Sequence, residues 1–88
     1  MTEYEGTGEV LHGGKVVGKW RYEIFSYEKE RTGRVFPDTS MSEIASLLGL
    51  KLTLVLENGK RLDFYIVSWP LQGICATIQP TGAIYDAP

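Results

Sequence analysis

The sequence predicts a mainly β domain, a small barrel or sandwich of five to seven mostly antiparallel strands with one short helix near residues 40–48. Three observations lead to this fold class, which counts as α+β if the helix is included. Apolar and polar residues alternate over most of the chain, as they do in half-buried strands. Turns that contain glycine separate the alternating runs. One segment breaks the alternation with the spacing of an amphipathic helix.

The length and composition indicate one soluble domain. The chain has 88 residues, which suffices for a single hydrophobic core. Its apolar share of 43% and charged share of 23% are ordinary for a globular protein. No stretch approaches the ~20 apolar residues of a membrane span, and the N-terminus does not resemble a secretory signal. The single cysteine fits a reducing compartment. We therefore expect one cytoplasmic domain over residues 1–88 that does not enter a membrane.

The first two strands are expected over residues 2–11 and 15–25. Apolar residues share one face of the second strand: Val16, Trp20, Tyr22 and Ile24. On the core face of the first strand stand Gly6 and Gly8, which permit the sharp bend of a barrel corner. Gly13-Gly14 joins the two runs and can supply positive φ at both central positions of a tight hairpin turn.

A short helix is expected between the third and fourth strands. Ser40 and Glu43 have the spacing of a capping box, in which each side chain bonds a backbone N–H at the helix start. Apolar residues then follow at i, i+3 and i+4: Ile44, Leu47 and Leu48. Gly49 stands where a helix C-terminus is usually capped. The helix over residues 40–48 is expected to close one end of the sheet.

A second hairpin is expected over residues 51–57 and 60–66. Each run alternates, with apolar residues on one face: Leu52, Leu54 and Leu56, then Leu62, Phe64 and Ile66. Asn58-Gly59 between the runs is a strong hairpin signal and favours a type I′ turn, which needs positive φ at both central residues.

The remaining segments are shorter. Residues 28–34 are rich in charge and are expected to form a turn before a short strand at 34–36. A proline and a glycine predict a chain reversal at 69–73, followed by a strand at 74–79. Residues 83–85 are a candidate edge strand. This order of elements resembles that of the OB-fold, a five-stranded barrel, and SH3-like or six-stranded barrels fit it as well. No motif assigns the chain to a family.

The two hairpins resemble each other in sequence. "VLHGGK" at 10–15 and "VLENGK" at 55–60 agree at four of six positions, and "WRYEIFSY" at 20–27 can be laid against "LDFYIVSW" at 62–69. Duplication of one hairpin would produce a barrel with a pseudo-two-fold axis. The alternative is that any two hairpins with glycine turns and alternating aromatic residues look alike.

Both long second strands change their face pattern near the end. Phe25 and Tyr27, and likewise Val67 and Trp69, fall on the face that charged residues occupy earlier in the same strand. A β-bulge could shift the phase by one residue. Otherwise both faces are covered there, by the helix or by a partner.

The leading functional hypothesis is a non-catalytic binding module that uses an aromatic surface. Through this surface it would contact a protein partner or a second copy of itself, in which case it would form a homodimer. The residues proposed for that surface are Phe25, Tyr27, Tyr65, Val67 and Trp69. The alternative is an OB-like barrel that binds single-stranded nucleic acid through basic and aromatic side chains. Its residues would be Lys15, Lys19, Arg21, Arg61 and Tyr65. The net charge of −2 disfavours this alternative.

The inventory of reactive side chains is thin, so a small-molecule-binding barrel or an enzyme is the third hypothesis. His12 is the only histidine and flanks a hairpin turn, where a general base would lack a positioned partner. Cys75 is the only cysteine and is expected in a strand with no base nearby. No group of residues has the spacing of metal ligands. We expect no catalysis, no metal and no cofactor.

Overall fold

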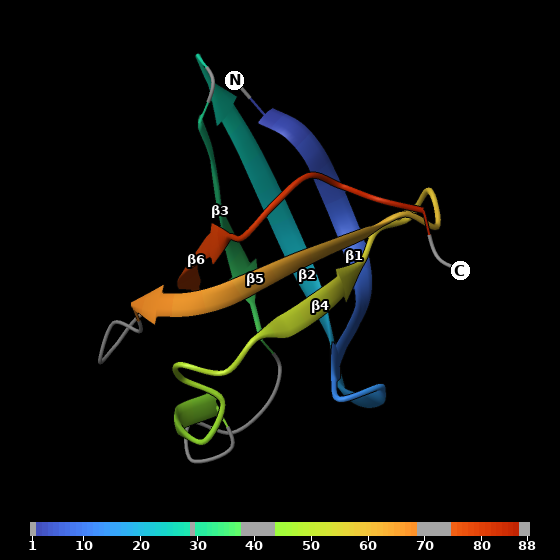
Figure 1. The fold of residues 1–88 in the computed structure, drawn as a ribbon, viewed down its shortest axis with the longest axis vertical. Coiled ribbons are helices and arrows are strands. Elements are labelled where there is room, and N and C mark those ends of the chain that lie inside the picture. The colour runs from blue at the N-terminus through green and yellow to red at the C-terminus, as the bar shows by residue number, and fades with distance from the viewer. Residues whose placement is uncertain (1, 29, 38–43, 69–74, 87–88) are drawn as a thin grey trace.

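The computed structural model describes residues 2–28, 30–37, 44–68 and 75–86. They form a closed barrel of six antiparallel strands (Figure 1). The strands are β1 (Thr2–His12), β2 (Lys15–Tyr27), β3 (Glu30–Phe36), β4 (Leu52–Val55), β5 (Arg61–Ser68) and β6 (Ala76–Pro80). Around the barrel their order is β1-β2-β3-β6-β5-β4, and β4 pairs with β1 to close it. The predicted mainly β fold is confirmed, and of the alternatives the chain adopts a six-stranded barrel.

The barrel consists of two meanders of three strands, β1–β3 and β4–β6. Exchanging β1 with β4, β2 with β5 and β3 with β6 reproduces every strand pairing, so the topology has the pseudo-two-fold symmetry that the repeated hairpin sequence suggested. The matched residues of the long second strands occupy equivalent places, whereas those before the turns do not, since Val10 is buried and Val55 is only partly buried. Trp20 and Leu62 both lie in the core. The next two matched pairs do so as well, Tyr22 with Phe64 and Ile24 with Ile66.

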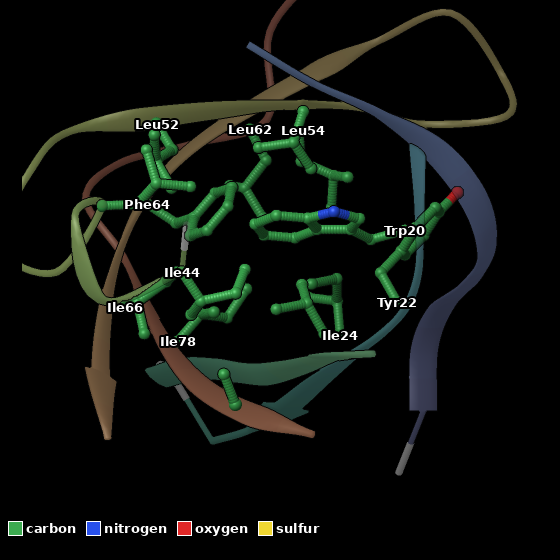
Figure 2. Packing of buried hydrophobic residues seen from close by; sticks show 14 of the residues in the cluster. Trp20, Tyr22, Ile24, Ile44, Leu52, Leu54, Leu62, Phe64, Ile66 and Ile78 are labelled. Carbon is green, nitrogen blue, oxygen red and sulfur yellow. The ribbon is translucent and has the colours of Figure 1, made fainter. Parts of the chain in front are cut away.

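The core fills the barrel with side chains from all six strands (Figure 2). Its fully buried members include Trp20, Tyr22, Ile24, Leu52, Leu54, Leu62, Phe64 and Ile78. They alternate with exposed neighbours because successive residues of a strand point to opposite faces. The alternation therefore predicted most of the core correctly.

Val16 is an exception to that prediction. It is 56% exposed, and Val17 packs against the core instead. The register between β1 and β2 shifts between Val10↔Gly18 and Leu11↔Val16, which marks a bulge at Val17. A bulge adds one residue to one strand and reverses the faces beyond it.

The expected helix is described only in its second half. Residues 40–43 lie outside the described residues. Ile44 and Ala45 are helical, and the chain then continues in turns with N–H groups bonded three residues back, such as Leu47 N to Ile44 O at 2.9 Å. Ile44 and Leu47 are buried in the core, as the predicted apolar stripe requires, whereas Leu48 is 44% exposed. Gly49 has a φ of +81°, which suits the predicted cap.

The prediction of a type I′ turn at Asn58-Gly59 needs correction. Gly13 and Gly14 both have positive φ, as expected, but at the second hairpin only Gly59 does. Leu56 O accepts from Gly59 N, and Leu56 N donates to Lys60 O, so the loop has three residues with glycine in the bulge position. Asn58 instead accepts a hydrogen bond from Lys60 N through its side chain at 2.9 Å.

The segment expected to be a charged turn is part of β3. Only the start of residues 28–34 turns the chain, with Glu28 at a φ of +56°, and the strand begins at Glu30. The alternation of apolar and polar side chains is interrupted in this segment, because the buried residue Gly33 has no side chain. The reversal predicted at 69–73 lies outside the described residues, and the predicted edge strand at 83–85 is a single bridge between Tyr85 and Arg61. Within the ranges given above, no helix is long and apolar enough to cross a membrane.

Candidate functional site

The barrel separates the residues predicted to form one aromatic surface. β2 and β5 are three strands apart in either direction around the ring of six, so their outer faces point away from each other. Phe25 and Tyr27 belong to β2, whereas Tyr65 and Val67 belong to β5. Trp69 lies outside the described residues. Two separate surfaces therefore replace the one that was predicted.

The change of face pattern in β5 has its cause in a bulge. The register with β6 shifts between Ile66↔Ile78 and Ser68↔Thr77, which leaves Val67 as the extra residue. Val67 is 58% exposed and Ser68 is exposed too, so both point outward opposite Thr77. In β2 the pairing with β3 is regular to the end of the strand, from Arg21↔Phe36 to Tyr27↔Glu30. The two matched strand ends thus differ in structure.

The outer side of β6, and of β5 from Tyr65 onward, carries no charged residue, and we call this surface the β5–β6 face. Its residues are Tyr65, Val67, Ser68, Thr77 and Gln79. Tyr65 pairs with Gln79 across the two strands and is 37% exposed. The turn that carries Ile44 and Leu47 directs both side chains into the core, and Tyr65 and Val67 remain exposed. Sequence reasoning found Tyr65 and Val67 but missed Ser68, which the bulge turns outward, and the residues of β6, because it did not place β6 beside β5.

The outer side of β2 and β3 is charged, in contrast, and we call it the β2–β3 face. Its residues are Arg21, Glu23, Phe25, Arg34 and Phe36. Glu23 Oε1 accepts a hydrogen bond from Arg34 Nε, and Glu23 Oε2 lies 3.9 Å from Arg21 Nη1. The guanidinium of Arg21 lies 3.8 Å from the centre of the Phe36 ring, and that of Arg34 lies 5.4 Å from the centre of the Phe25 ring. The charged groups of this face are therefore engaged in cation–π contacts and ion pairs with one another and with the two phenylalanine rings.

The residues of the nucleic-acid hypothesis are not brought together. Lys15, Lys19 and Arg21 lie on β2, whereas Arg61 and Tyr65 lie on β5, on the opposite side of the barrel. The Nε atom of Arg61 is buried and has no hydrogen-bond partner among the residues that the structure describes. A single strand that followed the basic residues of β2 would not reach Tyr65.

A polar cluster around Asp63 holds the C-terminal segment against β5. One Asp63 carboxylate oxygen, Oδ1, accepts hydrogen bonds from Thr53 Oγ1 and from the Tyr85 hydroxyl, each at 2.8 Å, and Oδ2 lies 3.5 Å from Lys51 Nζ. Burial raises the pKa of Asp63, but the hydrogen bonds from Tyr85 and Thr53 and the charge of Lys51 outweigh it, so the pKa lies below its usual value. The carboxylate is thus stabilised in its charged form.

The change Asp63→Asn is expected to destabilise the protein by about 1–2 kcal/mol at pH 7, because hydrogen bonds to a charged acceptor are lost. A carboxylate with a lowered folded-state pKa contributes stability above its unfolded pKa of about 3.9, and this contribution disappears as the pH falls through the folded pKa. The stabilities of the two proteins should therefore converge below about pH 4. Urea unfolding across this range measures the difference. Asp86→Asn is the control, since that side chain is 84% exposed, and a change as large as for Asp63 would contradict the prediction.

An open cleft of about 810 Å³ lies between β3 and the segment that follows β6. Its lining comprises Tyr27, Glu30, Arg31, Thr32, Gln79, Pro80, Gly82 and Ala83. Of the predicted site residues that the structure describes, only Tyr27 belongs to it. Arg31 is 28% exposed at its side chain and donates from Nε to Glu3 Oε1 at 2.7 Å. Sequence reasoning missed Arg31 because it assigned residues 28–34 to a turn.

The two reactive side chains singled out in the sequence lie on different parts of the barrel. His12 is exposed at the end of β1, and Cys75 is partly buried just before β6. Across residues 2–28, 30–37, 44–68 and 75–86, no three histidine, cysteine or acidic residues are grouped so that they could hold a metal ion.

Comparison of the chain with protein-family models, with curated proteins and with solved structures finds no match. Its function must therefore be inferred from the geometry of its surfaces.

Proposed function

We propose that the protein is a non-catalytic binding module that associates with a second copy of itself through the β5–β6 face. The observation that carries this proposal is the absence of charge from Tyr65, Val67, Ser68, Thr77 and Gln79, together with the 58% exposure of Val67. The centres of protein interfaces are depleted of charged residues and enriched in tyrosine.

The other half of the barrel supplies an internal comparison. In the pseudo-two-fold arrangement, the pair Glu23↔Arg34 on β2 and β3 corresponds to Tyr65↔Gln79 on β5 and β6. The first pair is an ion pair, as is common on a sheet surface that faces water. The second pair contains no charge, so this side of the barrel lacks the ion pair of its counterpart.

A second copy is the partner that suits this face. A two-fold contact places the same surface of both copies face to face, so an unpaired charge in it would lie near a like charge of the other copy. The β5–β6 face contains none, and the nearest carboxylate, Asp63, is engaged with Thr53, Tyr85 and Lys51. β5 pairs with β4 from Arg61 to Phe64 and with β6 from Phe64 to Ser68. The residues proposed for the contact lie on the outer side of the sheet, so the contact would be made by their side chains.

The change Val67→Lys is expected to abolish self-association, since it places a charge at the centre of the contact. The measurement is solution mass by sedimentation equilibrium, from micromolar concentrations up to roughly 1 mM, because a small interface binds weakly. The wild type should show a concentration-dependent dimer and the variant a monomer throughout.

Val16→Lys is a matched control for this experiment. Val16 is 56% exposed, almost the same fraction as Val67, but it lies beside the β1–β2 turn. This variant should associate like the wild type. A wild-type protein that stays monomeric at every concentration, or an equal effect of both lysine substitutions, would refute the β5–β6 face as the site of association.

A further inference from the structure

The cleft beside β3 is produced by a break in strand pairing. β3 pairs with β2 over all its residues, from Glu30 to Phe36, but it pairs with β6 only from Gly33 to Val35. β6 meanwhile continues along β5 as far as Pro80. The first residues of β3 are therefore paired on one side only, and the barrel is open at this point.

Pro80 accounts for the break. Continued in the same register, the β3–β6 ladder would place Gln79 opposite Thr32 and Pro80 opposite Arg31. Proline has no N–H to donate to a ladder, so the pairing cannot extend past it. After Pro80 the chain bonds to β5 instead, with Thr81 N donating to Asp63 O at 3.0 Å. In the part of the chain that the structure describes, no strand lies beside this edge of β3.

An unpaired strand edge is a template for another extended chain. Its N–H and C=O groups can accept an added strand, which is a common way for proteins to bind peptides. The cleft volume of about 810 Å³ lies within the range of known ligand sites. The wall opposite β3 includes Gly82, which has no side chain, and Ala83, which has only a methyl group, so there is room for a peptide backbone.

The charges at the cleft favour a basic peptide. Glu30 and Arg31 line it, and Glu3 is paired with Arg31, so two carboxylates against one guanidinium leave one negative charge. An anionic ligand would be repelled. Tyr27, at the lip, is 74% exposed and offers a ring to a cationic side chain.

We propose that this cleft binds an extended peptide segment with basic side chains, which adds to the open edge of β3 as a further strand. Glu30 and Tyr27 contact the basic side chains, and the β3 backbone holds the peptide main chain. The cleft shares Gln79 with the β5–β6 face, but its occupation does not require self-association.

The test is an NMR titration of the ¹⁵N-labelled protein with a capped heptapeptide in which valine and lysine alternate. Binding should shift the backbone amides of residues 30–33, 78, 79 and 81–83, with a dissociation constant of about 1 mM or lower. A peptide with glutamate in place of lysine, and one with proline at its centre, should bind at least tenfold more weakly. Inorganic phosphate should leave these amides unshifted.

Glu30→Lys is expected to weaken binding of the lysine peptide at least tenfold, because it reverses a charge in the cleft. Glu9→Lys makes the same change on the exposed part of β1 and should leave binding unaltered. The proposal is overturned if the peptide shifts no amide at several millimolar, if the glutamate peptide or phosphate binds as well, if the shifts lie outside the cleft, or if the two charge reversals act alike.

Discussion

Replacement of Phe64 by alanine is expected to destabilise the protein by about 3–5 kcal/mol, which is the usual loss when a large aromatic side chain is removed from a core. Phe64 is completely buried, and it points into the barrel among side chains from other strands (Figure 2). Its neighbours are held by strands that are hydrogen-bonded on both sides, so they can collapse only partly into the space. For a chain of 88 residues this loss is a large part of the total stability.

Tyr65→Ala is the control for that measurement. Tyr65 follows Phe64 in β5 but points outward and is 37% exposed. Its removal deletes a cross-strand contact with Gln79 and should change the free energy of unfolding by less than about 1 kcal/mol. Denaturant unfolding of the two variants under the same conditions decides the matter. Similar losses for both would mean that β5 does not divide its side chains between core and surface as described.

Replacement of Gly8 by alanine is expected to destabilise the protein by about 3 kcal/mol or more, by overpacking at the line where the barrel closes. A Cβ atom on Gly8 would lie 1.8 Å from the carbonyl oxygen of Val55 on β4. That oxygen belongs to the backbone and cannot move aside without displacing the strand. β1 and β4 are joined only at Val10↔Leu54 and Leu11↔Thr53, so little pairing resists their separation.

Gly82→Ala serves as the control for Gly8→Ala. A Cβ at Gly82 would meet no atom within 4 Å, and its φ is not in the left-handed region. The substitution should change stability by less than about 0.5 kcal/mol. Thermal or denaturant unfolding of both variants, together with amide protection of β1 and β4, measures the effect. A tolerated Gly8→Ala would show that the two strands are not in close contact at this point.

The tight contact at Gly8 also explains why glycine recurs on the core face of β1. Gly6 is close to the side chain of Glu57, whose Oε2 accepts a hydrogen bond from Thr7 N at 2.7 Å. The sequence analysis predicted that the glycines permit a bend of the barrel. The structure adds that they let the second hairpin approach the backbone of β1.

The sequence predicted the candidate surfaces only in part. Tyr65 and Val67 were recognised because bulky residues followed charged ones on the same face of a strand. Thr77 and Gln79 could not be recognised, since nothing local indicates which strand lies next to β6. Arg31, in the cleft, was hidden in a charged stretch whose buried glycine weakened the alternation.

By itself the sequence determined that the chain is a mainly β domain, where most strands begin and end, and which side chains fill the core. These properties are local, because alternation with a period of two divides a strand between water and the interior, and glycine permits the turns. Only the tertiary structure decided which outer faces lie together, where bulges reverse a face, and where the barrel opens. Those properties depend on pairing between strands far apart in the sequence, as when β3 meets β6 for three residues and Pro80 ends the contact. The sequence of either strand alone does not contain that information.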